Sequence, residues 1–466
     1  MLTGRQQELA LLEKAFADRR SHFTVCYGRR RVGKTMLLRE FVKKKQAFFY
    51  SSLKTTLLKQ IKEFLKEWAL FSKDHLVATA PCRSWVDVFD LIKNRLGPQK
   101  TVIVLDEFQW MCGADQTLIS VLQHVWDKDW QFNNRVHVIL CGSSVSFMLM
   151  KVLSEKSPLF GRRTQSFEVM PFDCQDSASL MKNNHWYDTA RFFMLFGGIP
   201  AYLNLYDCHL SFEQNINALS FCKNAYFVNE LKFVLSEQLK QPAVYYKILR
   251  LLSLKSQNLT QLAGKLRTTT SSVIFNTRRL QDIGVIKEHK PVLADETSKT
   301  LLYKISDEYV RFYFAYIYPF RELIENNAKK FIFDSIVGTN WNAYLGRCFE
   351  DFCHKNLAKI TKHIGVDATF VRSGSYWHKK NARFKQGVQI DLVIETSQRI
   401  TYIGECKWSQ DKVGYSIMKE LDEKIKLYPN HKKNKLKKLL ISSAGVTNNL
   451  IDHPELTIMT LKDFYC

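Results

Sequence analysis

The sequence predicts a multidomain α/β protein, and three observations support that fold class. Short apolar runs alternate with stretches of helical periodicity in residues 1–172, as they do in α/β domains. Residues 335–466 return to the same pattern, whereas the two segments between them, 173–238 and 239–325, are mainly helical. The length of 466 residues is too great for one ordinary core and, at about 150 residues per domain, predicts about three domains.

Composition narrows the class of protein. The chain is 46% hydrophobic, 13% aromatic and 24% charged, which excludes a disordered or fibrous protein. No apolar run reaches the ~18 residues that cross a bilayer, and Met1–Glu8 lacks the features of a signal peptide, so we expect a soluble, cytoplasmic protein. The eleven cysteines are scattered without a C-x-x-C pair, which indicates reduced thiols rather than structural zinc.

The net charge indicates the kind of partner. Lys and Arg number 68 against 45 Asp and Glu, which gives +23 at pH 7. Such an excess favours a polyanion, either nucleic acid or an anionic membrane. Because the sequence contains no amphipathic anchor and no lipidation signal, we expect DNA as the partner and no membrane.

The strongest chemical signal is a phosphate-binding loop in the first domain. His22–Tyr27 predicts a buried strand and Met36–Lys43 a helix, and between them runs G-x-x-x-x-G-K-T. Its glycines let backbone N–H groups surround phosphates at a helix N-terminus, where the partial positive charge is favourable. Lys34 would reach the β- and γ-phosphates of ATP, and Thr35 would ligate Mg²⁺. The predicted nucleotide-binding residues of the loop are Gly28, Arg29, Arg30, Arg31, Val32, Gly33, Lys34 and Thr35.

Two further predicted strands end in polar residues. Thr101–Leu105 is a continuous apolar run that leads into Asp106 and Glu107, and the carboxyl ends of parallel strands lie beside such a loop. Asp106 would hold the Mg²⁺ shell, and Glu107 would polarise the attacking water. Val136–Cys141 leads to Ser143, whose hydroxyl would sense the γ-phosphate. Three such strand ends in this order predict ATP binding and hydrolysis.

The first domain also resembles AAA+-type ATPases. The sequence T-G-R-Q-x-E-L near its start looks like their N-terminal motif, and Ser157–Arg163 and Gly197–Pro200 are similar to segments of the archaeal and bacterial signal-transduction (STAND-like) branch. The resemblance implies an arginine finger at Arg162 or Arg163, completing the site of a neighbour in a homo-oligomer or of a partner ATPase. It also implies an adenine contact from Pro200 in a helical lid. The residues alone leave alternatives open: a basic pair facing phosphate or DNA, and a plain helix-terminating turn.

The middle of the chain predicts three helices and a β-ribbon. Apolar residues recur at helical spacing, the short second helix is capped, and the third ends at a glycine. The strands Val285–Glu288 and Thr300–Ile305 follow, with a polar wing between them. This order predicts a winged helix whose Arg278 and Arg279 would face DNA. The alternative is a module that packs within the protein or contacts another protein. We expect the aromatic run 311–318 to be interdomain core.

The last domain carries two carboxylates and a lysine on consecutive predicted strands. Asp391 lies on the first strand, and Glu405 and Lys407 share one face of the next because side chains repeat every two residues. Two carboxylates and the backbone carbonyl of Cys406 make an oxygen-only Mg²⁺ site, with the lysine positioned to activate water. Glu350, on a predicted helix upstream, is a further metal contact.

These residues resemble a nuclease signature. Asp391-(x13)-Glu405-Cys-Lys407 looks like the D-x(n)-E-x-K core of the PD-(D/E)XK nuclease superfamily, and G-x-x-F-E ending at Glu350 looks like its first helix. Ile390 stands where the superfamily has a proline. The alternative is an ordinary exposed Glu-x-Lys strand pair. A lysine run expected beside this site would contact DNA, or would be only a solvated face; it comprises Lys424, Lys426, Lys432, Lys433, Lys435, Lys437 and Lys438.

The sequence as a whole predicts an α/β P-loop NTPase core with a helical lid, a winged-helix domain and a C-terminal α/β restriction-endonuclease-like domain. The predicted function is an ATP-binding and ATP-hydrolysing DNA-binding protein with an Mg²⁺-dependent nuclease domain, acting in defence or mobile-element biology. The alternative is a STAND-like signalling or scaffold ATPase whose C-terminal domain only binds DNA or protein. ATP and Mg²⁺ are the predicted cofactors.

Overall fold

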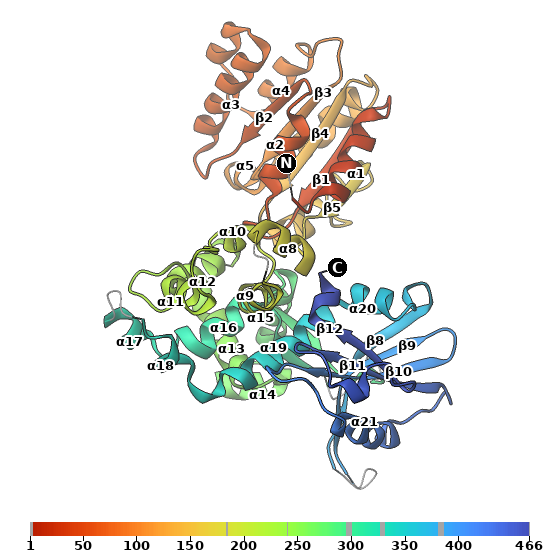
Figure 1. Cartoon of the computed structure of the whole chain (residues 1–466). Coiled ribbons are helices and arrows are strands. Elements are labelled where there is room, and N and C mark those ends of the chain that lie inside the picture. The colour runs from red at the N-terminus through yellow and green to blue at the C-terminus, as the bar shows by residue number, and fades with distance from the viewer. Residues whose placement is uncertain are drawn as a thin grey trace. The chain divides into compact units, whose positions relative to one another are not determined.

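The chain folds into two compact units, Met1–Pro171 and Phe172–Cys466 (Figure 1). One hydrophobic cluster runs through the second unit from Phe172 to Tyr465, so the three segments predicted to follow the first domain share a core. Within the described residues, none of the helices is long and apolar enough to cross a membrane. The computed structural model describes residues 3–182, 185–239, 241–294, 301–326, 331–380 and 386–465.

The first unit is a parallel sheet with helices on both faces (Figure 1). Its strands are β1 (His22–Tyr27), β2 (Ala47–Ser51), β3 (Thr101–Asp106), β4 (Val136–Gly142) and β5 (Gln165–Glu168). Its helices are α1 (Gln6–Ala17), α2 (Lys34–Val42), α3 (Leu57–Ser72), α4 (Trp85–Lys93), α5 (Phe108–Ala114), α6 (Leu118–Val125) and α7 (Val145–Phe147). Helices α1 and α2 pack on one face and α3 to α6 on the other, which explains why β3 and β4 are buried along their whole length.

The strand order of this sheet positions the first site. The order is β2-β3-β4-β1-β5, and all neighbouring strands are parallel. The strand predicted to carry the phosphate loop is therefore flanked by β4, with β3 one strand further. The carboxyl ends of β1, β4 and β3 meet at one edge of the sheet, where open α/β sheets bind their ligands.

The second unit begins with helices and a short β-ribbon. The segment 173–238, predicted as a lid, forms α8 (Cys174–Met181), α9 (Trp186–Phe196), α10 (Pro200–Leu203), α11 (Phe212–Ser220) and α12 (Tyr226–Gln238). The segment after it forms α13 (Pro242–Leu254), α14 (Leu259–Leu266) and α15 (Thr270–Asp282) and the antiparallel strands β6 (Ile286–His289) and β7 (Leu302–Ile305). Gln257 adds an antiparallel bridge to Tyr303 of β7, so a third short strand element flanks the ribbon.

The aromatic run after the ribbon is buried. It spans α16 (Glu308–Phe312) and the π-helical turn Tyr313–Ile317, and Phe312 has no exposed surface. This confirms the expectation that these rings form core rather than stack on bases. The short helices α17 (Arg321–Asn326) and α18 (Phe333–Val337) follow.

A mixed five-stranded sheet forms the C-terminal part of the second unit (Figure 1). Its elements are α19 (Trp341–Lys355), α20 (Leu357–His363), β8 (Phe370–His378), β9 (Val388–Thr396), β10 (Ile400–Lys407), α21 (Ser416–Leu427), β11 (Lys435–Ser442) and β12 (Leu456–Thr460). The strand order is β12-β11-β10-β9-β8, with β10, β11 and β12 parallel and β8, β9 and β10 antiparallel. The predicted strand–turn–strand is the β9–β10 hairpin, against which both α19 and α21 pack.

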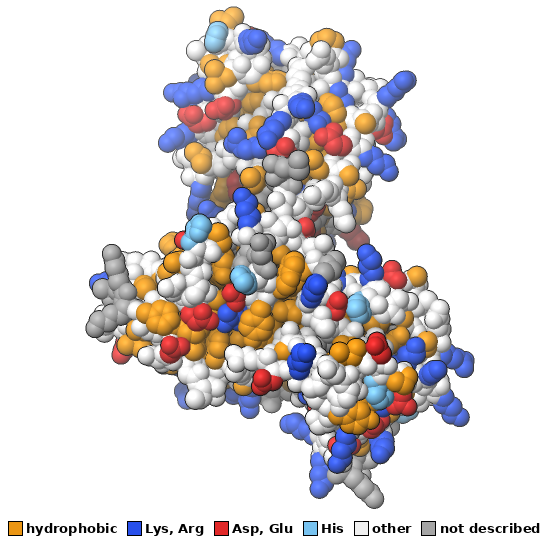
Figure 2. Space-filling model, viewed as in Figure 1, with side chains coloured by type: hydrophobic (Ala, Val, Ile, Leu, Met, Phe, Trp, Pro, Cys, Tyr) orange, Lys and Arg blue, Asp and Glu red, His pale blue; other side chains and the backbone are white. Residues whose placement is uncertain are grey.

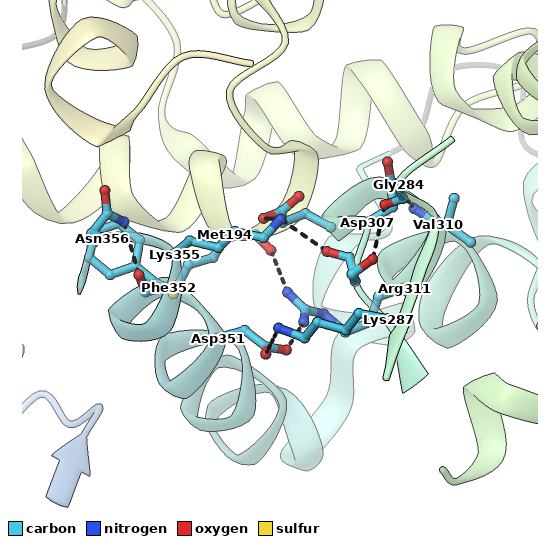
Figure 3. Close-up of polar contacts among 12 residues, drawn as sticks. Met194, Gly284, Lys287, Asp307, Val310, Arg311, Asp351, Phe352, Lys355 and Asn356 are labelled. Carbon is cyan, nitrogen blue, oxygen red and sulfur yellow. Dashed lines mark hydrogen bonds and ion pairs between the residues drawn. The ribbon is translucent and has the colours of Figure 1, made fainter. Parts of the chain in front are cut away.

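One buried carboxylate joins the ribbon, the aromatic helix and α19 (Figure 3). Asp351 accepts hydrogen bonds from Lys287 of β6 at 3.2 Å, from Lys304 of β7 at 3.0 Å and from Arg311 of α16. Arg311 also donates to the carbonyl of Met194 in α9. Burial works to raise the pKa of Asp351, but the three cations outweigh it and hold that pKa well below its usual value. The aspartate is therefore ionised, and its charge is shared by three segments distant in sequence.

Replacing this carboxylate should destabilise the second unit strongly. Asp351→Asn leaves three cations around a neutral amide, and breaking a buried pair by removing one partner costs about 3–5 kcal/mol. Denaturant unfolding measures the loss. Asp90→Asn is the matched control, because Asp90 is exposed and pairs only with Lys93 on the surface of α4, where little change is expected. Equal stability of the two variants would show that the Asp351 cluster does not hold the unit together.

Candidate active sites

The phosphate loop connects β1 to α2 in a conformation that requires its two glycines. Gly33 caps α2 with φ of 94°, in the left-handed region that favours glycine. At Gly28, where φ is 152°, an added Cβ would lie 2.4 Å from the carbonyl oxygen of Val169, so no side chain fits there. Arg5, from the N-terminal T-G-R-Q motif, donates to the carbonyl of Val32 at 2.8 Å and ties that motif to the loop. Sequence reasoning assigned no role to this arginine.

The two chemical residues of the loop are held in place by hydrogen bonds. Lys34 is buried, and its ammonium donates to the carbonyls of Gly28 and Arg29 at 2.8 and 2.9 Å. Thr35 donates through Oγ1 to Oδ2 of Asp106 at 2.8 Å. The hydroxyl and the carboxylate predicted to share an Mg²⁺ ion are thus in direct contact. Both are hard oxygen donors, which is the ligand type that Mg²⁺ prefers, so these residues fit the ion.

A polar triangle lies at the ends of β3 and β4. Glu107 has a left-handed backbone with φ of 54°, and its Oε2 accepts a hydrogen bond from Ser143 Oγ at 2.6 Å. Gln109 donates through Nε2 to the same carboxylate and also to Ser143 Oγ, the latter at 3.0 Å. The structure therefore brings the predicted glutamate and serine together. Gln109 was missed, and the only signal in the sequence was a polar residue in an otherwise apolar segment.

The two arginines of the predicted finger are engaged elsewhere in the first unit. Arg162 donates through Nε to both carboxylate oxygens of Asp127, at 3.0 and 3.1 Å, and this hydrogen bonding lowers the pKa of Asp127. Arg163 donates to the carbonyl of Leu153 at 2.8 Å. Both lie just before β5, which is parallel to β1. They are therefore at the amino ends of the strands, whereas the phosphate loop follows the carboxyl end of β1. Pro200 lies in the second unit, at the first turn of α10.

The carboxylates of the second site are buried on neighbouring strands. Asp391 of β9 and Glu405 of β10 are 8% and 2% exposed. Asp391 Oδ2 accepts a hydrogen bond from the backbone N–H of Cys406 at 3.1 Å. Because N–H and C=O of one strand residue point to the same side, the carbonyl of Cys406 faces Asp391 as well.

The electrostatics of this site indicate a shortage of positive charge. Burial and then the neighbouring Asp391 raise the pKa of Glu350, from α19, to about 8 and that of Glu405 to about 7. Buried carboxylates that repel one another hold protons more tightly, and a divalent cation such as Mg²⁺ would relieve the same repulsion through an oxygen-only donor set. In this structure, however, the carboxylate oxygens of Glu350, Asp391 and Glu405 do not all lie within 4.8 Å of one another. Within the described ranges, the group of three ligand atoms within 4.8 Å of one another is the exposed Asp207–His209 segment.

Helix α21 adds two charged residues to this site. Lys407 donates to both carboxylate oxygens of Glu420, at 2.9 and 3.0 Å, and lies 3.2 Å from Glu405. Lys424 contacts Glu405 and lies 3.2 Å from Glu420. Sequence reasoning missed Glu420 and counted Lys424 only as part of the lysine run. The E-x-x-x-K spacing, which puts both on one helix face, was the available signal.

Part of the lysine run lies away from Asp391 and Glu405, not beside them as expected. Lys435 at the start of β11 is opposite Ile400, whereas Glu405 is opposite Leu440, five residues or roughly 17 Å further along the strand. The lysines also differ among themselves. Lys432 pairs with Glu395, Lys437 lies over the Tyr402 ring, Lys433 and Lys435 are exposed, and Lys438 is buried between Asp422 and Glu455.

The predicted DNA-facing residues of α15 share their surface with apolar side chains. Arg278 is exposed, and Arg279 lies over the ring of Phe275, itself 56% exposed. The ribbon packs on the C-terminal sheet: His289 stacks on Trp377 of β8 at 4.3 Å. In the view of Figure 2, Lys and Arg side chains are spread over both units and interspersed with Asp and Glu.

The parallel sheet, the G-x-x-x-x-G-K-T loop after β1 and the acidic end of β3 define the first unit as a P-loop ATPase domain. Residues 2–205 match the family described as an ATPase domain predominantly from Archaea. Residues 313–422, which contain the buried carboxylates, match a family described as archaeal and bacterial proteins of unknown function. Residues 2–205 therefore contain the ATPase domain of this predominantly archaeal family.

Individual proteins agree with this assignment. An uncharacterised protein of Methanocaldococcus jannaschii is 26% identical over 431 residues, 92% of each chain. An uncharacterised ATP-binding protein of the same organism is 41% identical over 46 residues, 10% of this chain and 78% of its own. Among solved structures, the Walker-type ATPase of Pyrococcus abyssi superposes with a TM-score of 0.50 at 19% identity, covering 67% of this chain and 96% of that one. At that identity the likeness shows the fold alone.

Two substitutions should separate nucleotide binding from hydrolysis. Lys34→Ala should abolish tight ATP binding, because the ammonium neutralises phosphate charge. Glu107→Gln should keep binding and stop hydrolysis, because the carboxylate acts only on the attacking water. Binding of a fluorescent ATP analogue and release of phosphate measure the two steps. Hydrolysis by Glu107→Gln at the wild-type rate would contradict the role given to Glu107.

Proposed function

We propose that the protein is an ATP-hydrolysing, DNA-binding enzyme with an Mg²⁺-dependent phosphodiesterase site in its second unit. The observation that carries the proposal is the pair of acidic centres. Asp106 and Glu107 adjoin the phosphate loop, and Asp391 and Glu405 are buried on neighbouring strands, where burial and the charge of Asp391 raise the pKa of Glu405 to about 7. The first belongs to the ATPase domain of the family, and the second lies in the part of the chain that matches the family of unknown function.

At the ATPase centre each residue has a distinct role. Lys34 and the loop N–H groups bind the β- and γ-phosphates, and Thr35 and Asp106 hold Mg²⁺, which offsets phosphate charge when bound. Glu107 accepts a proton from the attacking water as its oxygen bonds to the γ-phosphorus. The bond to the bridging oxygen breaks, and ADP and phosphate leave.

At the carboxylate centre the residues suit phosphodiester hydrolysis. Asp391, Glu405, Glu350 and the carbonyl of Cys406 would hold Mg²⁺, which offsets charge on the scissile phosphate when bound. Lys407 would orient the attacking water, and its hydrogen bonds to Glu420 fix the ammonium. Lys424 neutralises Glu405 in the structure described, so cation binding would have to displace its ammonium from that carboxylate.

DNA binding would use α15 and the exposed lysines. The order α13, α14, α15, β6 and β7, with the bridge from Gln257, supports a winged helix in 239–325. Arg278 of α15 is exposed and Arg279 is half-buried over Phe275, so these two arginines would contact the DNA backbone. The exposed Lys433 and Lys435 would add a separate phosphate contact.

A neighbouring protomer, or a partner ATPase, would complete the ATPase centre. Arg162 and Arg163 lie at the sheet edge opposite their own phosphate loop, so either would act as a finger in trans, after release from Asp127 or Leu153. Pro200 and the helices of 173–238 would serve as the adenine-facing lid.

The alternative is a signalling or scaffold ATPase with no nuclease activity. The contacts of Lys424 with Glu405 and of Lys407 with Glu420 favour it, because they already neutralise charge that a metal and a phosphate would otherwise use. The second unit would then be a DNA- or protein-binding module that keeps the residues without their chemistry.

Cleavage assays distinguish the two functions. Plasmid and linear DNA should be cut in the presence of Mg²⁺ or Mn²⁺, and Asp391→Ala should abolish cutting while leaving DNA affinity nearly intact, because the aspartate binds metal rather than DNA. Lys407→Ala should cut far more slowly. Asp367→Ala, at an exposed acid of the same unit, is the matched control and should cut normally. If the wild type cuts nothing with any metal, with or without ATP, the nuclease function is wrong.

Mixing experiments test the finger in trans. Lys34→Ala cannot bind ATP but keeps its arginines, and an Arg162→Ala, Arg163→Ala double variant keeps its loop. Mixed together, they should regain part of the ATPase activity, because one protomer completes the site of the other. Phosphate release at several mixing ratios is the measurement. A strictly monomeric protein without recovery on mixing would exclude a finger supplied by another protomer.

A further inference from the structure

We propose that Gln109 is a positioning residue of the ATPase centre, which holds the carboxylate of Glu107 in place when ATP engages Ser143. The inference deepens the proposed ATPase function and rests on it. It starts from the polar triangle formed by these three residues at the ends of β3 and β4.

The contacts of Gln109 use both protons of its side-chain amide. The residue lies in the first turn of α5 and is 7% exposed. Nε2 donates to Oε2 of Glu107 and, at 3.0 Å, to Oγ of Ser143. Ser143 in turn donates to Oε2 of Glu107 at 2.6 Å. Two donors therefore fix one carboxylate oxygen, which leaves Oε1 of Glu107 to accept a proton from water.

The chemistry of the contacts fixes the orientation of the amide. A flipped amide would turn Oε1 of Gln109 against the Glu107 carboxylate and lose the donor to both partners. In the observed orientation this Oε1 is buried and has no hydrogen-bond partner among the described residues. Buried acceptors without partners are rare and cost stability. An apolar side chain of the same size would avoid that cost, so packing alone does not explain a glutamine here.

The glycine that ends β4 leaves room for this arrangement. A Cβ added at Gly142 would lie 3.1 Å from Oε1 of Gln109 and 2.5 Å from the sulfur of Met148. A larger residue would therefore crowd Met148 and, less closely, the amide of Gln109. The end of β4, directly before the serine, thus leaves room for the glutamine.

The number of protons that Ser143 and Gln109 can donate explains why Glu107 needs the glutamine. The Ser143 hydroxyl has one proton, which it gives to Glu107 in this structure. A γ-phosphate oxygen bound beside Ser143 would need the same proton, so Glu107 would lose that hydrogen bond when ATP binds. The Gln109 amide has two protons and can keep its contacts to both residues. The Glu107 carboxylate then keeps its orientation towards the attacking water, while the Ser143 hydroxyl donates its hydrogen bond to the phosphate.

Gln109→Met tests the role, because methionine has a similar size and no donor. We expect the kcat for ATP hydrolysis to fall about tenfold or more while KM stays within about threefold of wild type. Affinity for a non-hydrolysable ATP analogue and the melting temperature should be unchanged. Gln109→Glu, which removes the donor and adds a like charge beside Glu107, should lower kcat at least as much. Gln131→Met is the matched control, because Gln131 is half-buried and donates only to the backbone carbonyl of Asp127.

The outcomes distinguish a positioning role from a structural one. A kcat for Gln109→Met within twofold of wild type would overturn the inference. So would a loss of rate matched by equal losses of nucleotide affinity and melting temperature, since that pattern means misfolding of the domain. A wild-type protein that hydrolyses no ATP would instead overturn the proposed ATPase function itself, because there would be no hydrolysis rate for the variants to lower.

Discussion

The contact of three cations with the buried carboxylate of Asp351 is the interaction on which the second unit depends. Lys287 and Lys304 come from the β-ribbon and Arg311 from the aromatic helix, so the contact links segments that the sequence alone separates into different domains. An unpaired charge is costly in a protein interior, so the contact stabilises the unit only while all of its charged partners are present. Asp351 lies on α19, and the same helix carries Glu350 of the second acidic site.

Asp351 and Glu350 are neighbours in sequence whose pKa values shift in opposite directions. Asp351 has more cations around it than its charge requires, and its pKa falls. Glu350 is buried near Asp391 and Glu405, and its pKa rises to about 8. The sign of the shift separates a structural ion cluster from a site that lacks positive charge. In the first unit, the buried carboxylate of Asp106 is instead held by neutral donors: the hydroxyl of Thr35 and the backbone N–H of Glu107.

Local patterns allowed much of the fold and of the first site to be predicted. His22–Tyr27 is β1 as predicted, and the β9–β10 hairpin carries Asp391 and Glu405 as the alternation of side chains indicated. What failed depends on contacts between distant segments. The displacement of Lys435 from Glu405 follows from the register of β11 on β10, which no local pattern encodes. Gln109 and Glu420 were missed because their roles exist only through the partners that the fold brings to them.

Both acidic centres should take a divalent ion, and counting bound Mn²⁺ by electron paramagnetic resonance tests this most directly. Without nucleotide, the wild type should bind about one Mn²⁺ per chain, at the carboxylate site of the second unit, and Asp391→Ala should bind none. Adding ADP should recruit about one further ion, held at Thr35 and Asp106. A wild type that binds Mn²⁺ only together with nucleotide would contradict the account, because the second acidic site would then not be a metal site.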